Sequence, residues 1–273
     1  MRPALSQVCS LHSPFGTDLA EYAAGHCEAI DVWLTKLETH VQSTSVDATR
    51  RLLDEHGIRA PVASFQGGLL MTQGEARQES WKLFEGRLEL CAKLNIVTLV
   101  VACDVVAPNS QQDLDRAQVS LKQAAERAAE HDVRLALEFQ ARAGFGNNLQ
   151  TAAAWVAEVN HPNLGLCLDT FHFYVGPSKT EDLHYLSKEN LFHVQFCDLA
   201  DTPREFASDS DRILPGDGDI PLPAIVARLH EIEYEDYVAL ELMNPQIWQV
   251  PPRQVGEIGM TALRTVLGQA RME

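Results

Sequence analysis

Four side chains that can offer oxygen ligands stand at the downstream ends of four short apolar runs. The runs read Leu-Ala-Leu-Glu, Leu-Cys-Leu-Asp, Phe-His-Val-Gln and Ala-Leu-Glu, and they end at Glu138, Asp169, Gln195 and Glu241. Clustered carboxylates repel one another, so at least one of them would take up a proton unless a cation lay between them. We therefore predict that these four residues bind one divalent metal ion.

The donor atoms indicate which metal this would be. Three carboxylates and one amide form an all-oxygen set, which suits Mg²⁺ or Mn²⁺, whereas zinc and copper sites favour nitrogen and sulfur. We predict one Mn²⁺ or Mg²⁺ ion, with Zn²⁺ and Co²⁺ as the less favoured ions. Any one of these acids could instead cap a helix or form a surface salt bridge, but four in succession favour a shared site.

The elements that must position these residues alternate along the chain. Apolar runs bounded by turn residues predict strands, and the segments between them have helical periodicity. The expected strands span residues 4–10, 28–34, 60–66, 96–103, 133–139, 164–170, 191–197 and 237–243. The clearest expected helices span residues 110–131, with Ser110 and Asp113 as caps, residues 45–56, ended by Gly57, and a last one from Pro251-Pro252 to about Arg271.

This alternation predicts an α/β protein with a parallel sheet. Eight units in 273 residues favour closure into a single (β/α)8 TIM barrel, and we expect one domain over residues 1–273. A doubly wound open sheet is the alternative, but the Gly-x-Gly-x-x-Gly turn typical of its ligand site is missing after the first strand. In a barrel the carboxyl ends of the strands converge, which would gather the four ligands at one face.

Two histidines lie close to these strand ends in the sequence. His172 follows Asp169 by three residues, where it could donate a hydrogen bond to a substrate oxygen, move a proton, or remain an exposed spectator. Side chains alternate along a strand, so His193 should share the face of Gln195 and reach the same cavity from one layer below. Both histidines are therefore expected near the metal.

Further candidates lie on the segments that follow the strands. Arg212 lies near the end of a segment of roughly 22 residues without periodicity, and loops that long are usually lids or disordered. Arg212 could neutralise an anionic enediolate, carboxylate or phosphate, or form a salt bridge to Asp209 or Asp211. Trp248, after the eighth strand, could line the pocket, and His12, after the first strand, could join it.

The net charge, the apolar runs and the cysteines of the chain indicate which partners and which cellular compartment to expect. A formal net charge of −16 would repel phosphate backbones, so we expect no nucleic-acid partner. No run reaches the roughly 18 apolar residues of a membrane span, and the first residues lack signal-peptide features. The six cysteines are scattered without a Cys-x-x-Cys pair and are expected to be buried thiols. These features predict a soluble cytoplasmic protein.

At these motifs the chain resembles the sugar phosphate isomerase/epimerase superfamily, the xylose isomerase-like TIM barrels. The resemblance covers nearly the whole chain and is most specific at Leu-Glu-Phe around Glu138, at residues 168–172, 192–195 and 214–220, and at Leu-Glu-Leu around Glu241. It implies that Glu138, Asp169, Gln195 and Glu241 are the ligands of one divalent metal. The nearest members by motif are inosose isomerase-like proteins, hydroxypyruvate isomerases and 3-dehydroshikimate dehydratases.

The resemblance also implies a reaction. A metal-dependent isomerase or epimerase would act through a metal-stabilised enediolate, with Glu138 and Glu241 exchanging a proton as the catalytic acid and base. His172 and His193 would hold substrate hydroxyls, His172 also being a candidate base, and Arg212 would close over the site. The expected substrate is a polyol ketone or a keto acid.

Two other functions stay open at this point. A 3-dehydroshikimate dehydratase would use the same metal site and the same first half-reaction before it expels hydroxide. A non-catalytic sugar-binding barrel would keep the fold without turnover, although an intact ligand set disfavours it. Relatives in this superfamily commonly form dimers or tetramers, so a homodimer or tetramer is expected.

Overall fold

The eight strands are short apolar runs, and they follow one another in sequence order around a closed barrel in the computed structural model, which describes residues 1–269. The strands are β1 (Arg2–Ser6), β2 (Ala29–Trp33), β3 (Arg59–Gln66), β4 (Thr98–Ala102), β5 (Arg134–Glu138), β6 (Leu164–Asp169), β7 (Leu191–Phe196) and β8 (Tyr237–Leu240). Strands β4 and β6 are buried at every residue, as expected for strands of a parallel sheet covered on both faces. The predicted α/β TIM-barrel class is confirmed.

Helices separate the strands, and the caps predicted at Ser110, Asp113 and Gly57 are present. They are α1 (Phe15–Ala24), α2 (Leu34–Ser43), α3 (Val46–His56), α4 (Gly74–Leu94), α5 (Gln111–Glu130), α6 (Leu149–Val159), α7 (Thr170–Val175), α8 (Leu222–Glu231) and α9 (Pro252–Val266). Short 3-10 helices are η1 (Gln7–Ser10), η2 (Thr180–Tyr185), η3 (Asp209–Asp211) and η4 (Ile247–Gln249). The Ser110 and Asp113 side chains form a capping box at the start of α5, and Gly57 ends α3 with a φ of 64°.

Three predicted boundaries are wrong by three residues or more: the end of the first strand, the end of α9, and the end of β8, which lies at Leu240 and not at residue 243. Residues 7–10 are the 3-10 helix η1 and not part of the first strand, because the Ser6 hydroxyl accepts a hydrogen bond from the Val8 N–H and turns the chain. Helix α9 ends at Val266 and not near Arg271. Gly268 has a φ of 70°. Its N–H group donates to the Thr265 carbonyl oxygen, and the Gln269 N–H group donates to the Arg264 carbonyl oxygen, which terminates the helix. Residues 270–273 lie outside the described part of the chain.

The chain divides into two compact units, Met1–Pro61 with the chain from Val194 onward, and Val62–His193. Both boundaries fall inside strands, β3 and β7, and not in a linker. The expectation of one domain over residues 1–273 stays a prediction. Within residues 1–269, no helix combines the length and the apolar character that crossing a membrane requires.

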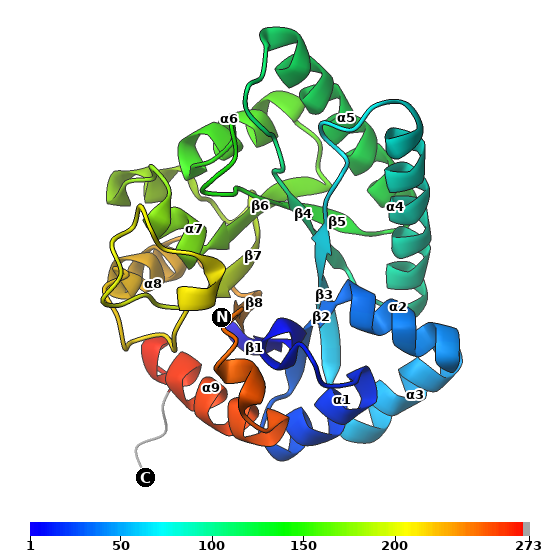
Figure 1. Cartoon of the computed structure of the whole chain (residues 1–273), viewed down its shortest axis with the longest axis vertical. Coiled ribbons are helices and arrows are strands. Elements are labelled where there is room, and N and C mark those ends of the chain that lie inside the picture. Colours follow the sequence, from blue (N-terminus) through cyan, green and yellow to red (C-terminus); the bar gives the residue numbers. More distant parts are fainter. Residues whose placement is uncertain (270–273) are drawn as a thin grey trace. The chain divides into compact units, whose positions relative to one another are not determined.

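The first unit is built on parallel pairing of β1 with β2 and β8. Helices α1 and α9 pack together in this unit and are seen side by side at the blue and red ends of the colour scale in Figure 1. Gly25, directly after α1, permits this approach, because a Cβ atom there would lie 2.7 Å from the Arg253 carbonyl oxygen. The second unit pairs β3 with β4, β4 with β5, and β5 with β6, all in parallel.

One buried carboxylate orders the long segment after β7, which the sequence predicted to be a lid or disordered. Asp198 and Ile213 exchange two backbone hydrogen bonds of 2.9 Å. The Asp198 Oδ1 atom accepts from the N–H groups of Leu199 and Ile220 at 2.9 and 3.0 Å, and Oδ2 accepts from Gly216 N–H at 2.9 Å. Both halves of the segment are therefore tied to one side chain.

An Asp198→Ala substitution should lower the free energy of unfolding by roughly 2–4 kcal/mol, because three backbone donors lose a charged acceptor. Urea denaturation followed by circular dichroism measures this change. The matched control is Asp217→Ala in the same segment, whose exposed side chain has no assigned contact in the described structure; it should stay within about 0.5 kcal/mol of the wild type. Equal denaturation midpoints for the two variants would refute the tethering role.

A buried ion pair lies between α1 and α2 in the first unit. The Lys36 ammonium lies 2.7 Å from Asp18 Oδ2, and the two side chains are 8% and 0% exposed. Burial raises the pKa of Asp18 to about 6, and the charge and hydrogen bond of Lys36 only partly oppose this shift. The folded protein therefore binds a proton at Asp18 more tightly than the unfolded chain does.

This raised pKa predicts a pH-dependent difference between the wild type and an Asp18→Asn variant. The stability that Asp18 contributes is fully present below its unfolded pKa, near 3.8, and is lost as the pH rises through about 6. Between pH 7 and pH 4 the wild type should gain about 2–3 kcal/mol relative to the variant, at about 1.4 kcal/mol per pKa unit. Urea titrations across this range give the difference, and a difference that does not change with pH would contradict the prediction.

Candidate metal centre

Two carboxylates and an imidazole come together at the ends of β5 and β6 in the second unit. Glu138 ends β5, Asp169 ends β6, and His172 lies in α7 directly after β6. One ligand atom from each of these buried residues lies within 4.8 Å of the other two. The paired register of β5 and β6 brings the first two together, since Glu138 pairs with Cys167, two residues before Asp169. Two carboxylates and one imidazole are donors that fit a divalent cation.

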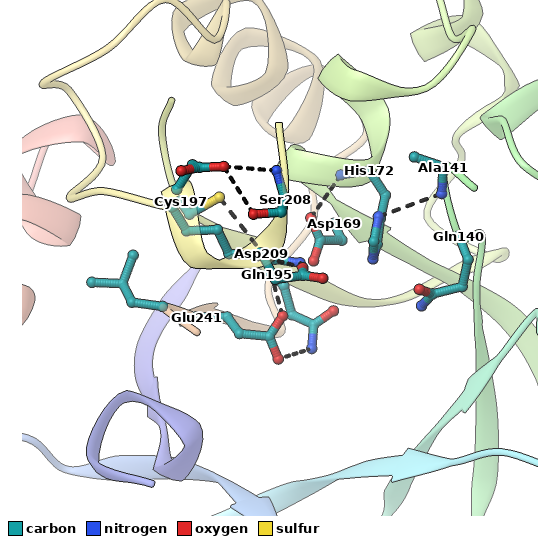
Figure 2. A network of polar contacts seen from close by, with 12 residues as sticks. Gln140, Ala141, Asp169, His172, Gln195, Cys197, Ser208, Asp209 and Glu241 are labelled. Atoms are coloured by element: carbon teal, nitrogen blue, oxygen red, sulfur yellow. Dashed lines mark hydrogen bonds and ion pairs between the residues drawn. The ribbon is translucent and has the colours of Figure 1, made fainter. Parts of the chain in front are cut away.

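Hydrogen bonds orient each member of this group. Gln140 Nε2 donates to Glu138 Oε2 at 2.5 Å, and the His172 N–H donates to Asp169 Oδ1 at 3.0 Å, so that Asp169 also caps α7. The Ala141 N–H donates to His172 Nδ1 at 3.4 Å, and Figure 2 shows this contact. Since Nδ1 accepts from the Ala141 N–H, Nε2 is the ring atom that would bind a metal ion or, in the tautomer that carries its proton there, donate to a substrate oxygen.

The other two predicted ligands form a bonded pair in the first unit. Gln195 Nε2 donates to Glu241 Oε1 at 2.9 Å, and both residues are buried (Figure 2). Because the amide nitrogen donates, the amide oxygen of Gln195 is the atom that could ligate a metal. Gln195 belongs to β7, as the sequence predicts, whereas Glu241 directly follows β8 and does not lie within it, because β8 ends at Leu240.

Arg212 joins this pair from the long segment after β7. Its Nη1 atom lies 3.1 Å from Glu241 Oε2, its Nη2 atom lies 2.7 Å from Asp209 Oδ1, and its side chain is 1% exposed. Asn244 Nδ2 also donates to the Arg212 carbonyl oxygen at 3.0 Å. The salt bridge to Asp209, one alternative from the sequence, is thus present. Its ion pair with Glu241 was not expected.

The remaining candidates lie in or near these strand ends. The rings of His12 and Trp248 meet edge to face with centroids 5.3 Å apart, and Trp248 Nε1 donates to the Val8 carbonyl oxygen at 2.8 Å. His193 is fully buried within β7. Contact of these three residues with a substrate stays a prediction.

The structure describes the predicted ligands in two separate pairs. Glu138 and Asp169 belong to one compact unit, and Gln195 and Glu241 belong to the other. A single ion bound by all four stays a prediction. His172 also lies in the ligand group and is buried, whereas the sequence indicated a substrate contact, a proton-transfer role or an exposed spectator. Gln140 was missed, although its position two residues after Glu138 was a usable signal.

Comparisons with known proteins agree with this description. A family model described as the xylose isomerase-like TIM barrel matches residues 19–266. An inosose isomerase from Bacillus subtilis (strain 168) is 33% identical over 171 residues, which are 61% of each chain. A 3-dehydroshikimate dehydratase from Pseudomonas aeruginosa is 27% identical over 261 residues, which are 93% of this chain and 40% of that relative. The matches thus span less than two thirds of the length of these relatives.

Among solved structures, the IOLI protein with a bound zinc atom aligns over 100% of both chains with a TM-score of 0.92 and 24% identity. At that identity the similarity establishes the fold alone. The zinc is a property of that protein.

Proposed function

Because the chain belongs to the xylose isomerase-like TIM barrel family, we propose that it is a divalent-metal-dependent isomerase or epimerase. It would act beside the carbonyl group of a sugar, an inosose or a related hydroxy-ketone. The observation that carries the proposal is the buried group of Glu138, Asp169 and His172 at adjacent strand ends. The similarity to an inosose isomerase supports the substrate class.

The proposed ligands are Glu138, Asp169, Gln195 and Glu241, and the proposed ion is Mn²⁺ or Mg²⁺ because the set is all oxygen. When bound, the ion would supply Lewis-acid stabilisation of negative charge on the substrate oxygens. The bond from Gln195 to Glu241 supports a shared role, since it places these two proposed ligands in direct contact.

The chain's own groups would move the proton. Glu138 and Glu241 are the proposed acid and base at the carbon beside the carbonyl, and Glu241 is held in an ion pair with Arg212. In the tautomer in which Nδ1 accepts from the Ala141 N–H, His172 would donate to a substrate oxygen from Nε2. We also propose that the substrate is contacted by His193, Arg212, Trp248 and His12.

A dehydratase acting on 3-dehydroshikimate is the second candidate. The relative with that activity aligns with 93% of this chain, a larger share than the inosose isomerase does. Both reactions begin when a carboxylate removes a proton beside a carbonyl group. They differ afterwards, because a dehydratase then releases a hydroxide and an isomerase returns the proton.

A substrate panel in heavy water with added Mn²⁺ or Mg²⁺ tests the proposal. The panel contains inososes, ketoses, hydroxypyruvate and 3-dehydroshikimate. We expect metal-dependent deuterium uptake at the carbon beside the carbonyl of one polyol ketone. Nuclear magnetic resonance measures this uptake. An ultraviolet-absorbing catechol acid from 3-dehydroshikimate would select the dehydratase instead. Absence of exchange and product across the whole panel would favour a non-catalytic sugar-binding barrel. A cytoplasmic location and a homodimer or tetramer stay predictions.

A further inference from the structure

The 3-10 helix η1 contacts the backbone on both sides of Glu241 and the indole of Trp248 in the first unit. The thiol of Cys9 accepts a hydrogen bond from the Leu242 N–H at 3.2 Å and lies 3.5 Å from the Leu240 carbonyl oxygen, to which it donates. These two backbone groups flank Glu241 on either side. The carbonyl oxygen of Val8, also in η1, accepts the Trp248 indole N–H. A shift of η1 would therefore move both Glu241 and Trp248.

Lys36 fixes the position of η1 from the neighbouring helix α2. Its ammonium donates to the carbonyl oxygens of Gln7 and Ser10, at 3.0 and 2.5 Å, which are the first and last residues of η1. It also donates to Asp18 Oδ2 at 2.7 Å. An ammonium has three N–H donors, so these three acceptors use all of them and fix the side chain in one place.

A second contact reinforces this arrangement. Gln7 Nε2 donates to Asp18 Oδ2 at 3.1 Å, and Gln7 Oε1 accepts from the Trp33 N–H at 3.2 Å. Asp18 thus receives both the ammonium and the amide, and η1 is attached at its start to the end of β2. All of these side chains are buried or nearly so.

We propose that Lys36 is a positioning residue, which acts through η1 to hold Glu241 and Trp248 in place for catalysis. The catalytic part of this inference rests on the proposed function, whereas the positional part does not. A buried ion pair contributes little net stability, because desolvation offsets the attraction between the charges. Neutralising Lys36 and Asp18 together is therefore expected to cost little stability, whereas removing Lys36 alone leaves Asp18 buried without its partner and is expected to lower the free energy of unfolding.

A Lys36→Met variant keeps the length of the aliphatic chain and removes the three donors. We expect the 5-fluorotryptophan resonance of Trp248, assigned with Trp248→Phe, to shift or broaden in the ¹⁹F spectrum. The dissociation constant for Mn²⁺ should rise about tenfold, as for the loss of other residues that orient a ligand. The value of kcat should fall about 10- to 100-fold, with a smaller change in KM, because small misplacements of catalytic groups act mainly on turnover.

Two further variants complete the test. Lys93→Met, which removes an exposed ion pair with Glu89 on α4, should leave every readout unchanged. The double variant Asp18→Asn with Lys36→Met replaces the buried pair by neutral groups and should fold. It should still show the altered Trp248 resonance, because the contacts to the Gln7 and Ser10 carbonyl oxygens are not restored.

The outcomes separate this inference from the proposed function. If the wild type neither binds Mn²⁺ nor turns over any substrate, the proposed function is wrong. The Trp248 resonance still tests whether Lys36 positions η1. An unchanged Trp248 resonance in folded Lys36→Met would overturn the inference. So would a double variant that does not fold, since Lys36 and Asp18 would then be a requirement of the fold itself.

Discussion

Glu241→Gln is expected to lower kcat by about 10³-fold, the order of magnitude assigned to a general acid or base. An amide cannot accept the proton that the proposed reaction removes. The fold should be retained, because Arg212 keeps its ion pair with Asp209 and the new amide oxygen can accept one of the two present hydrogen bonds. Deuterium uptake into the substrate measures turnover, and circular dichroism checks the fold.

The control for this change is Glu257→Gln on α9 in the same unit, whose partly exposed carboxylate pairs only with Arg253 among its assigned contacts. The Glu257→Gln variant should turn over substrate at the rate of the wild type. Near-normal exchange by a folded Glu241→Gln variant would remove Glu241 from the catalytic pair.

Asp169→Asn should raise the dissociation constant for Mn²⁺ by at least about 100-fold, since even residues that only orient a ligand change affinity 10- to 100-fold. The substitution removes one negative charge from the proposed ligand set. It leaves the cap of α7 in place, because an asparagine oxygen can accept the same His172 N–H. A loss of affinity would therefore report on the ion and not on the helix.

Titration of Mn²⁺ followed by electron paramagnetic resonance measures this affinity. Asp47→Asn provides the control, because Asp47 is an exposed acid in the first turn of α3. The Asp47→Asn variant should bind Mn²⁺ with the affinity of the wild type. A folded Asp169→Asn variant that binds the ion as tightly as the wild type would show that this carboxylate is not a ligand.

The strand ends could be predicted from the sequence because burial on both faces gives each strand a nearly continuous apolar run. Glu138 and Asp169 each interrupt such a run, and the structure ends β5 and β6 at these residues. The helix caps at Ser110 and Gly57 were likewise predictable, since their side chain or backbone conformation acts within a few residues.

Contacts between distant residues were not predictable in this way. Val8 and Cys9 look like a continuation of β1, but Ser6, Gln7 and Lys36 turn that segment into η1. The tie from Asp198 to Gly216 and Ile220 links residues about twenty positions apart, and nothing in the local pattern marks the carboxylate as their acceptor. The Glu241 ion pair with Arg212 depends on the same long segment.

The most direct measurement of the central claim is anomalous X-ray diffraction from crystals grown with Mn²⁺. The account predicts one strong anomalous peak, with oxygen atoms of Glu138, Asp169, Gln195 and Glu241 all at about 2.1 Å from it, the distance range of small divalent ions bound by oxygen. A map with no peak at these residues would contradict the account. So would an ion held by Glu138 and Asp169 while Gln195 and Glu241 face elsewhere.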